Sequence, residues 1–339
     1  MNPRVKKAVK YALLLLVVAV LLYFAFRGVS WADFVGGLKS CRWGWIIGTI
    51  AVMWIITWLR GNRWRIQLEP VRTGDRPITQ RETYDAYAIC YLANIVFPRS
   101  GEVVRCGLMA ETKKTTFEGA LGTVVIERTW DLLCMVLAVV PLLFFDHFRD
   151  FLVEKMFRPA AGAMGIGWFW IVLIVVAVLV AAVFVIRARR EQIARTKAGA
   201  AFLKFFKGLG NGISAAFKMK GKWAFFAYTV LIWVGYWLTS LMTIRAFPSA
   251  DGLNGLDALF LMVVGSLGWV VPVQGGFGAY HFIVSMTLVP IYGFDKQTGL
   301  IFATLSHESQ IVQMLLCGLL ALASWAIYRK KLKQTNTPA

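Results

Sequence analysis

Long apolar runs separated by short charged stretches make up most of the chain. A helix needs about 20 mainly apolar residues to cross a bilayer. Six runs come near that length, and we expect each to be a full membrane span: 11–26, 43–59, 119–145, 167–186, 223–247 and 300–328. The polar residues 306–309 interrupt the last run. Between the first two runs, apolar residues recur at helical spacing over 31–38, which predicts an amphipathic helix at the membrane surface.

Two other apolar regions are each divided into two arms that are too short to cross a bilayer alone. The arms are 84–97 and 103–109 in the first region, and 258–271 and 279–292 in the second. Proline lacks a backbone donor and glycine relaxes the backbone, so we expect a helix break in each region. The predicted break residues are Pro98, Gly101, Pro272, Gly275, Gly276 and Gly278. Non-helical backbone at membrane depth persists only where protein buries it or where it lines a hydrated cavity, so both regions are predicted to be re-entrant helical hairpins.

The composition agrees with this pattern and indicates one integral membrane domain over residues 1–339. Hydrophobic residues make up 58% of the 339 residues, charged residues only 16%, and the mean hydropathy is +0.62. In a soluble protein, the net charge of +19 would suggest a nucleic-acid partner. Here the basic residues stand beside apolar runs, as in cytoplasmic loops next to anionic lipids. We therefore predict contact with anionic lipids at the cytoplasmic surface and no nucleic-acid partner.

The distribution of Lys and Arg predicts the orientation. Residues 187–222 hold ten Lys or Arg and one acidic residue, and the stretches near both ends of the chain are basic. We expect a multi-pass protein of the inner (plasma) membrane with cytoplasmic N- and C-termini. If the region 84–110 crossed the bilayer completely, 187–222 would lie outside, against the positive-inside rule. A hairpin that enters and returns on the cytoplasmic side keeps every basic loop inside, so this interpretation is favoured.

The two halves of the chain, 43–186 and 223–328, carry the same order of parts, and the basic loop 187–222 joins them. In each half, a Pro-x-x-Gly break is followed by charged residues in the next apolar run. Opposite membrane orientation would make this an inverted repeat, the plan of many transporters. Such repeats bring their breaks together, so we expect Asn94 and Gln274 to approach each other near the bilayer midplane.

Polar side chains at the first break are candidates for lipid binding. Arg99 and Arg105 could hold a phosphate, because a guanidinium offers fork-shaped donors and a broken helix leaves backbone N–H groups free. Arg105 could instead pair with Glu102 three residues earlier, which would be a purely structural contact. Asn94 could equally well contact a substrate or cap the freed backbone.

Three ionisable residues fall inside the third predicted span. Glu127 and Asp131 stand four residues apart on one helical face, and Arg128 follows Glu127 directly. An acid at the bilayer centre costs roughly 2.5–3.5 kcal/mol, so the group needs partners or a hydrated cavity. Arg128 could simply pair with Asp131. We favour the interpretation that the cluster binds a polar head group or relays protons.

Polar residues also mark the second half. Gln274 lies in the glycine-rich break, which we interpret as a hinge because no strand precedes it. His281, His307 and Glu308 could suggest a metal ion, but their spacing resembles no known ligand set. We therefore predict that the histidines and Glu308 form a proton-sensitive contact or a packed polar pair. Gln274, His281, His307 and Glu308 all join the predicted substrate-binding set. The sequence predicts no metal, no cofactor and no catalytic residue.

Three short motifs spread over the chain resemble one known family. They are Asn94-x-x-x-Pro98-x-x-Gly101-Glu102-x-x-Arg105, Glu127-Arg128-x-x-Asp131, and Pro272 with Gly275-Gly276-Phe277-Gly278. Together they resemble the flippase-like membrane-domain family named after lysylphosphatidylglycerol synthase. The resemblance implies a membrane domain that moves aminoacylated or glycosylated lipids between leaflets, with aminoacyl transfer in a separate soluble domain. The family pattern usually has an acidic residue after the second glycine segment, where Tyr280-His281 stands here.

We therefore predict an all-α polytopic membrane protein with about six full spans and two broken hairpins. Its predicted function is to bind a polar phospho- or glycolipid and translocate it between leaflets. One alternative is a membrane transferase acting on lipid-linked substrates, with Glu127 or Asp131 as the base. It would need a metal-binding or nucleotide-binding constellation, and the sequence shows none. A non-catalytic subunit of an envelope-lipid complex is the other alternative.

Overall fold

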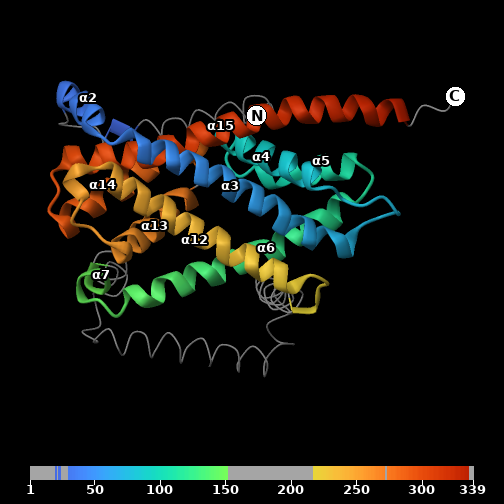
Figure 1. Cartoon of the computed structure of the whole chain (residues 1–339), viewed down its shortest axis with the longest axis horizontal. Helices are drawn as coiled ribbons and strands as arrows, with labels where there is room; N and C mark the ends of the chain where they lie inside the picture. Colours follow the sequence, from blue (N-terminus) through green and yellow to red (C-terminus); the bar gives the residue numbers. More distant parts are fainter. Residues whose placement is uncertain (1–19, 21, 24–29, 152–216, 272, 336–339) are drawn as a thin grey trace, which may run out of the picture. The chain divides into compact units, whose positions relative to one another are not determined.

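The computed structural model describes residues 20, 22–23, 30–151, 217–271 and 273–335. These residues form helices joined by short turns, which confirms the all-α prediction (Figure 1). They belong to two compact units: the first contains the described parts of 1–124 and 219–339, and the second those of 125–218. The α-helices are α2 (Trp31–Ser40), α3 (Trp43–Leu68), α4 (Gln80–Val96), α5 (Gly101–Glu111), α6 (Phe117–Leu142), α7 (Asp146–Asp150), α12 (Lys222–Ala246), α13 (Gly255–Val270), α14 (Ala279–Tyr292) and α15 (Lys296–Thr335). The 3-10 helices are η1 (Glu69–Val71), η3 (Pro248–Ala250) and η4 (Gln274–Gly276).

Among the described residues, the segments long and apolar enough to cross a membrane are Trp43–Val71, Lys222–Ala246 and Lys296–Lys330. Helix α12 lies within one residue of the fifth predicted span at each end. Its exposed side chains include Val230, Leu231 and Val234, as expected of a surface that faces lipid. The chain is therefore a helical membrane protein. The third predicted span, 119–145, forms α6, which contains Glu127, Arg128 and Asp131 and is not among these three segments. The count of six spans stays a prediction, because 11–26 and 167–186 also fall largely outside the described residues.

The short helix α2 confirms that residues 31–38 are helical, as predicted. Ser30 caps it, and the Ser30 Oγ accepts from the backbone N–H of Asp33 at 3.5 Å. Phe34 is buried, whereas Trp31 is exposed and stacks on it. One apolar side chain thus anchors α2 to the protein, and its placement at a membrane surface stays a prediction.

Helix α3 is longer than the sequence predicts. The second span is predicted to end at Leu59, with the following arginines in a cytoplasmic loop, but the helix continues to Leu68. Arg60 and Arg63 belong to its last turns and are buried. The Arg60 Nη1 donates to the Tyr236 hydroxyl at 2.7 Å. The loop prediction is wrong for these two residues, because neighbouring helices supply hydrogen-bond acceptors and aromatic rings to their guanidinium groups.

Helix α15 is continuous through the polar residues 306–309, which interrupt the apolar run of the last predicted span. The hydroxyl groups of Ser306 and Tyr280 are hydrogen-bonded at 2.7 Å. The Ser309 hydroxyl donates to the Ser306 carbonyl oxygen at 3.0 Å. Polar side chains do not break this helix, because partners within the protein satisfy them.

Both predicted breaks separate two helices. Helix α4 ends at Val96 and α5 begins at Gly101, while α13 ends at Val270 and α14 begins at Ala279. The order of long helix, short arm, break and second arm therefore occurs twice, as α3–α4–α5 and as α12–α13–α14. Re-entry of these arms and inversion between the two halves stay predictions.

The first arm of each hairpin begins with a capping box. Thr79 and Glu82 form a capping box at α4, and Asn254 and Asp257 form one at α13. In each box an acidic side chain accepts from the backbone N–H of the cap residue at 2.7 Å. The boxes satisfy donors that a helix start leaves open, so each arm begins at a defined residue.

Helices α3 and α12 lie side by side in the first unit (Figure 1). They approach closely because Gly235 of α12 has no side chain: a Cβ there would lie 2.8 Å from the Ile56 Cγ1. Met53, Leu59 and Ile232 complete this cluster. Helix α15 packs against α4 and α14, so it contacts one arm of each hairpin.

An exposed ion pair ties the start of α3 to the loop after α12. The Arg42 guanidinium donates to both carboxylate oxygens of Asp251, each at 2.7 Å. The backbone N–H of Arg42 also donates to the Ala246 carbonyl oxygen at 2.8 Å. The hydrogen bonds from Arg42 lower the pKa of the Asp251 carboxyl below its ordinary value. The pair therefore stays charged at lower pH than an isolated aspartate would allow.

Candidate functional site

The first break is held by its own polar side chains. The Ser100 hydroxyl donates to the carbonyl oxygens of Ala93 and Phe97, at 3.2 and 2.9 Å. The Asn94 Oδ1 accepts from the backbone N–H of Gly101 at 2.8 Å. These bonds satisfy groups that a broken helix frees. Asn94 thus makes the capping contact that was one of its two expected roles.

Arg99 connects the first break with the second. Its backbone φ is 59°, in the left-handed region that residues other than glycine rarely adopt. Its exposed guanidinium donates from Nη2 to the carbonyl oxygen of Val270, the last residue of α13, at 2.5 Å. Helix α4 also packs against η4, which contains Gln274. These contacts bring the two breaks together within the first unit.

Arg105 lies in a different environment from Arg99. Its side chain is fully buried. Its guanidinium carbon lies 4.6 Å from the centre of the Trp64 ring and 4.5 Å from the centre of the Tyr87 ring. Cation–π contacts of this kind contribute about 2 kcal/mol when they are desolvated. Arg105 therefore belongs to the core formed by α3, α4 and α5, while Glu102 is half-buried on α5.

Three glycines shape the second break. Gly275, Gly276 and Gly278 have φ values of 54°, 74° and 76°, which residues with a side chain rarely adopt. This turn places the Gly275 carbonyl oxygen 2.8 Å from the His307 Nε2. Among the described residues, the Gln274 Oε1 is buried without a hydrogen-bond partner. An acceptor in that state costs free energy unless something donates to it, so Gln274 remains a strong candidate for ligand contact.

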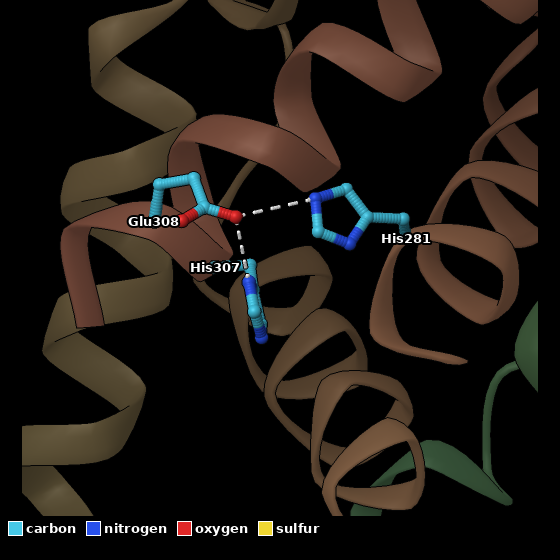
Figure 2. A group of neighbouring side chains, drawn as sticks. All are labelled: His281, His307 and Glu308. Carbon is cyan, nitrogen blue, oxygen red and sulfur yellow. Dashed lines mark hydrogen bonds and ion pairs between the residues drawn. The ribbon is translucent and has the colours of Figure 1, made fainter. Parts of the chain in front are cut away.

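Two histidines converge on one carboxylate oxygen of Glu308, as Figure 2 shows. The His307 Nδ1 lies 3.0 Å and the His281 Nε2 lies 3.5 Å from the Glu308 Oε1. His281 comes from α14, and the other two residues come from α15. Both histidines are buried, while 38% of the Glu308 side chain is exposed. These three residues are candidates from the sequence, but no sequence pattern indicates that His281 reaches the other two, because only packing joins the two helices here.

The cluster of Glu127, Arg128 and Asp131 lies on α6 in the second unit. The Arg128 Nη1 is 3.7 Å from the Asp131 Oδ2. The Arg128 side chain is half exposed, and Glu127 is buried. The ion pair between Arg128 and Asp131, which the sequence offered as the structural alternative, is therefore present.

A buried ionic group that the sequence does not predict lies at the start of α4. The Lys114 Nζ lies 2.8 Å from the Glu82 carboxylate and donates to the Pro77 carbonyl oxygen at 2.7 Å. The Tyr328 hydroxyl donates to the same carboxylate. The capping pattern of Thr79 and Glu82 marks the helix start. No local pattern shows that Glu82 also meets α15.

An apolar hollow of about 380 Å³ opens on the first unit. It is lined by Trp54, Ile55, Trp58 and Tyr84. Charged groups pay a large desolvation penalty on such a surface, whereas hydrocarbon does not. The hollow is therefore suited to an acyl chain.

Comparison with known proteins identifies a family. Residues 11–328 match the family described as "Lysylphosphatidylglycerol synthase TM region". No curated protein and no solved structure matches the chain.

Proposed function

Because this chain belongs to the lysylphosphatidylglycerol synthase transmembrane-region family, we propose that it binds a polar phospho- or glycolipid and moves it between the leaflets of the inner membrane. The family is a membrane domain associated with that synthase, so a lipid-related role at the membrane follows from membership. Translocation, the type of lipid and the inner membrane are the parts that we propose.

The meeting of the two helix breaks is the observation that carries this proposal. Broken helices leave backbone donors and acceptors open, and transporters built from repeats bind substrate between such breaks. The Arg99 bond to Val270 joins the breaks, and the unpartnered Gln274 Oε1 belongs to the second of them. In the proposed mechanism, the lipid head group enters at this junction while the acyl chains stay in the bilayer.

The accessible charged group at this junction is Arg99, and we assign the lipid phosphate to it. A guanidinium carries five N–H donors in a fork that matches phosphate oxygens, and the bond to Val270 takes one of them. Gln274 offers its acceptor to a hydroxyl or ammonium group of the head group. Arg105, buried between two aromatic rings, stabilises the core instead.

In the second unit, Glu127 and Asp131 are proposed to bind a cationic or hydroxyl-rich head group. Intramembrane acids are expensive to bury and are therefore functional candidates. The ion pair between Arg128 and Asp131 holds one of these acids in place. Because neutral isosteres keep the shape of each side chain, they test the charge without disturbing the packing.

Translocation by purified protein in liposomes tests the proposal. The probes are phosphatidylethanolamine and a glycolipid, each with a fluorescent label on an acyl chain, and an impermeant reductant destroys the fluorescence of the outer leaflet. The assay is run with and without a transmembrane pH gradient. We expect wild-type protein to expose inner-leaflet probe that protein-free liposomes retain.

Three variants test the assigned residues. Arg99→Lys keeps the charge but loses the fork, and losing one charge-assisted hydrogen bond of about 1.5–3 kcal/mol lowers the rate roughly tenfold or more. Glu127→Gln and Asp131→Asn abolish movement. Arg72→Lys is the matched control, because Arg72 makes a partly exposed pair with Glu69, and we expect the wild-type rate.

Either of two results contradicts the proposal. Folded wild-type protein that moves neither probe under any gradient removes lipid translocation as the function and leaves the transferase or the accessory subunit. Wild-type rates in stable Arg99→Lys, Glu127→Gln and Asp131→Asn variants remove those three residues from the site.

A further inference from the structure

We propose that His281, His307 and Glu308 bind a divalent first-row transition-metal ion of the zinc class. The sequence predicts no metal here, because the spacing of the three residues resembles no known ligand set. Their geometry changes that conclusion. The ligand atoms of the three side chains all lie within 4.8 Å of one another.

The hydrogen bond from His307 to the Gly275 carbonyl decides which ring nitrogen is free. A carbonyl oxygen only accepts, so the His307 Nε2 carries the hydrogen at 2.8 Å from Gly275. A neutral imidazole then presents a lone pair at Nδ1, which faces the Glu308 Oε1 at 3.0 Å. Two lone pairs at that distance repel, so a positive species belongs between them.

A metal ion fits the separations in this group better than a proton does. A proton on His307 would settle its contact with Glu308. The Nε2–H of a neutral His281 would then have to donate to the same oxygen over 3.5 Å, which is long for a hydrogen bond. A metal ion accepts lone pairs from all three residues at once. Two ligand atoms on a tetrahedral zinc ion are about 3.3 Å apart. The observed separations of 3.0 and 3.5 Å lie on either side of that value.

The surroundings of His307 match those of a metal ligand. Metal-ligating histidines usually donate their second ring N–H to a carboxylate or a backbone carbonyl, which fixes the tautomer and the ring orientation. The Gly275 carbonyl does this here. Trp269 stacks on the His307 ring and Phe277 meets it edge-on, at 5.3 and 4.9 Å between ring centres. An apolar wall of this kind limits the access of water to the ligands.

The ligand set also indicates the class of metal. Imidazole nitrogen suits zinc, copper, iron and nickel, whereas calcium and magnesium prefer oxygen ligands. Two histidines and one glutamate are three protein ligands, which leaves a tetrahedral ion one further position. Because 38% of the Glu308 side chain is exposed, an external oxygen ligand would reach the ion beside Glu308. The ion would also join α14 to α15.

Metal content and stability of the full-length chain test this proposal. The protein is purified in detergent with an affinity tag that contains no histidine, stripped with a chelator and titrated with Zn²⁺, or with Co²⁺ as an absorption probe. We expect binding of about one ion per chain and a higher unfolding temperature with metal than without. Co²⁺ should show the visible absorption of a four-coordinate nitrogen and oxygen site.

Matched variants locate the ion. Glu308→Gln and His281→Gln keep the side-chain shape approximately, and each should weaken Zn²⁺ binding roughly tenfold or more and remove the stabilisation by metal. His147→Gln is the control, because His147 is exposed on α7 and lies outside the group. It should bind Zn²⁺ as the wild type does.

Two outcomes overturn the proposal. Stripped wild-type protein that neither takes up Zn²⁺ stoichiometrically nor gains stability with it leaves a proton-linked contact in place of a metal site. Full binding by folded Glu308→Gln and His281→Gln places the ion elsewhere. If both variants fail to fold, the wild-type titration alone still decides. The outcome does not depend on lipid translocation.

Discussion

At the scale of single residues, this protein buries charge where the ends of its helices meet. Glu82, Lys114 and Tyr328 form one such group, with both charged side chains almost fully buried. A buried ion pair stabilises little in itself, because desolvation offsets the attraction, but loss of one partner strands the other. We call this group the tether, because it joins the start of α4 to α15. Removing one of its charges should lower the free energy of unfolding.

Glu82→Gln tests this tether. The change leaves the buried Lys114 ammonium without an opposite charge, so we expect the free energy of unfolding in detergent to fall by about 3–5 kcal/mol. A second change, Lys114→Met, should restore much of the loss. Chemical unfolding of the single and double variants is the measurement.

Glu69→Gln provides the control for Glu82→Gln. Glu69 also pairs with a basic residue, Arg72 at 3.2 Å, but 45% of its side chain is exposed. Exposed pairs contribute less than about 1 kcal/mol. Equal losses in Glu82→Gln and Glu69→Gln would show that burial of the tether has no energetic consequence.

At the scale of elements, close backbone contact holds each hairpin together. In the first hairpin, a Cβ on Gly101 would lie 2.2 Å from the Cys90 carbonyl oxygen. In the second, a Cβ on Gly268 would lie 2.7 Å from the Tyr280 Cα. A methyl group at either position would push the two arms apart, because backbone atoms have no rotamer to change.

Gly101→Ala and Gly107→Ala form a matched pair on α5. Gly101→Ala should lower the free energy of unfolding by about 1–3 kcal/mol through overpacking against α4. Nothing lies within 4 Å of a Cβ on Gly107, so Gly107→Ala should raise it by about 0.5–1 kcal/mol through better helix propensity. Thermal or chemical unfolding measures both. An unchanged free energy of unfolding in Gly101→Ala would contradict tight packing of α5 against α4.

At the scale of the whole molecule, the repeated order of long helix, capped arm, break and second arm is the main feature. The two capping boxes show that the first arms begin with the same local chemistry, and in each hairpin a glycine lets the two arms approach closely. If the two halves have opposite orientations, as predicted, the chain is an inverted repeat, a plan in which transporters bind substrate between the breaks. The orientation of the two halves in the membrane is the part that needs a direct test.

Cysteine accessibility tests the orientation. Lys113→Cys, at the exposed turn after α5, should react with an impermeant maleimide only from the cytoplasm. Asp150→Cys and Gly252→Cys should react only from outside, because neither loop carries the excess of Lys and Arg that marks a cytoplasmic loop. The labelling of wild-type protein is the control for the native cysteines. Labelling of position 113 from outside and of position 150 from the cytoplasm would contradict re-entry of the first hairpin.

The sequence by itself determined the features that follow from local rules. Proline lacks a donor and glycine tolerates positive φ, so the breaks near Pro98 and at Gly275 could be placed within a few residues. Hydropathy and length predicted α12 and α14 almost to the residue. The family motifs were also visible without a structure. These signals act over a few neighbouring residues, and the sequence carries them directly.

Only the tertiary structure decided which distant residues meet. The bond from Arg99 to Val270 joins positions 171 apart in the chain. The burial of Arg60 depends on a tyrosine hydroxyl of α12, so hydropathy assigned that arginine to a loop. His281 meets Glu308 because α14 packs against α15. Such contacts depend on the packing of whole helices, and a side chain's polarity does not reveal which partner will satisfy it.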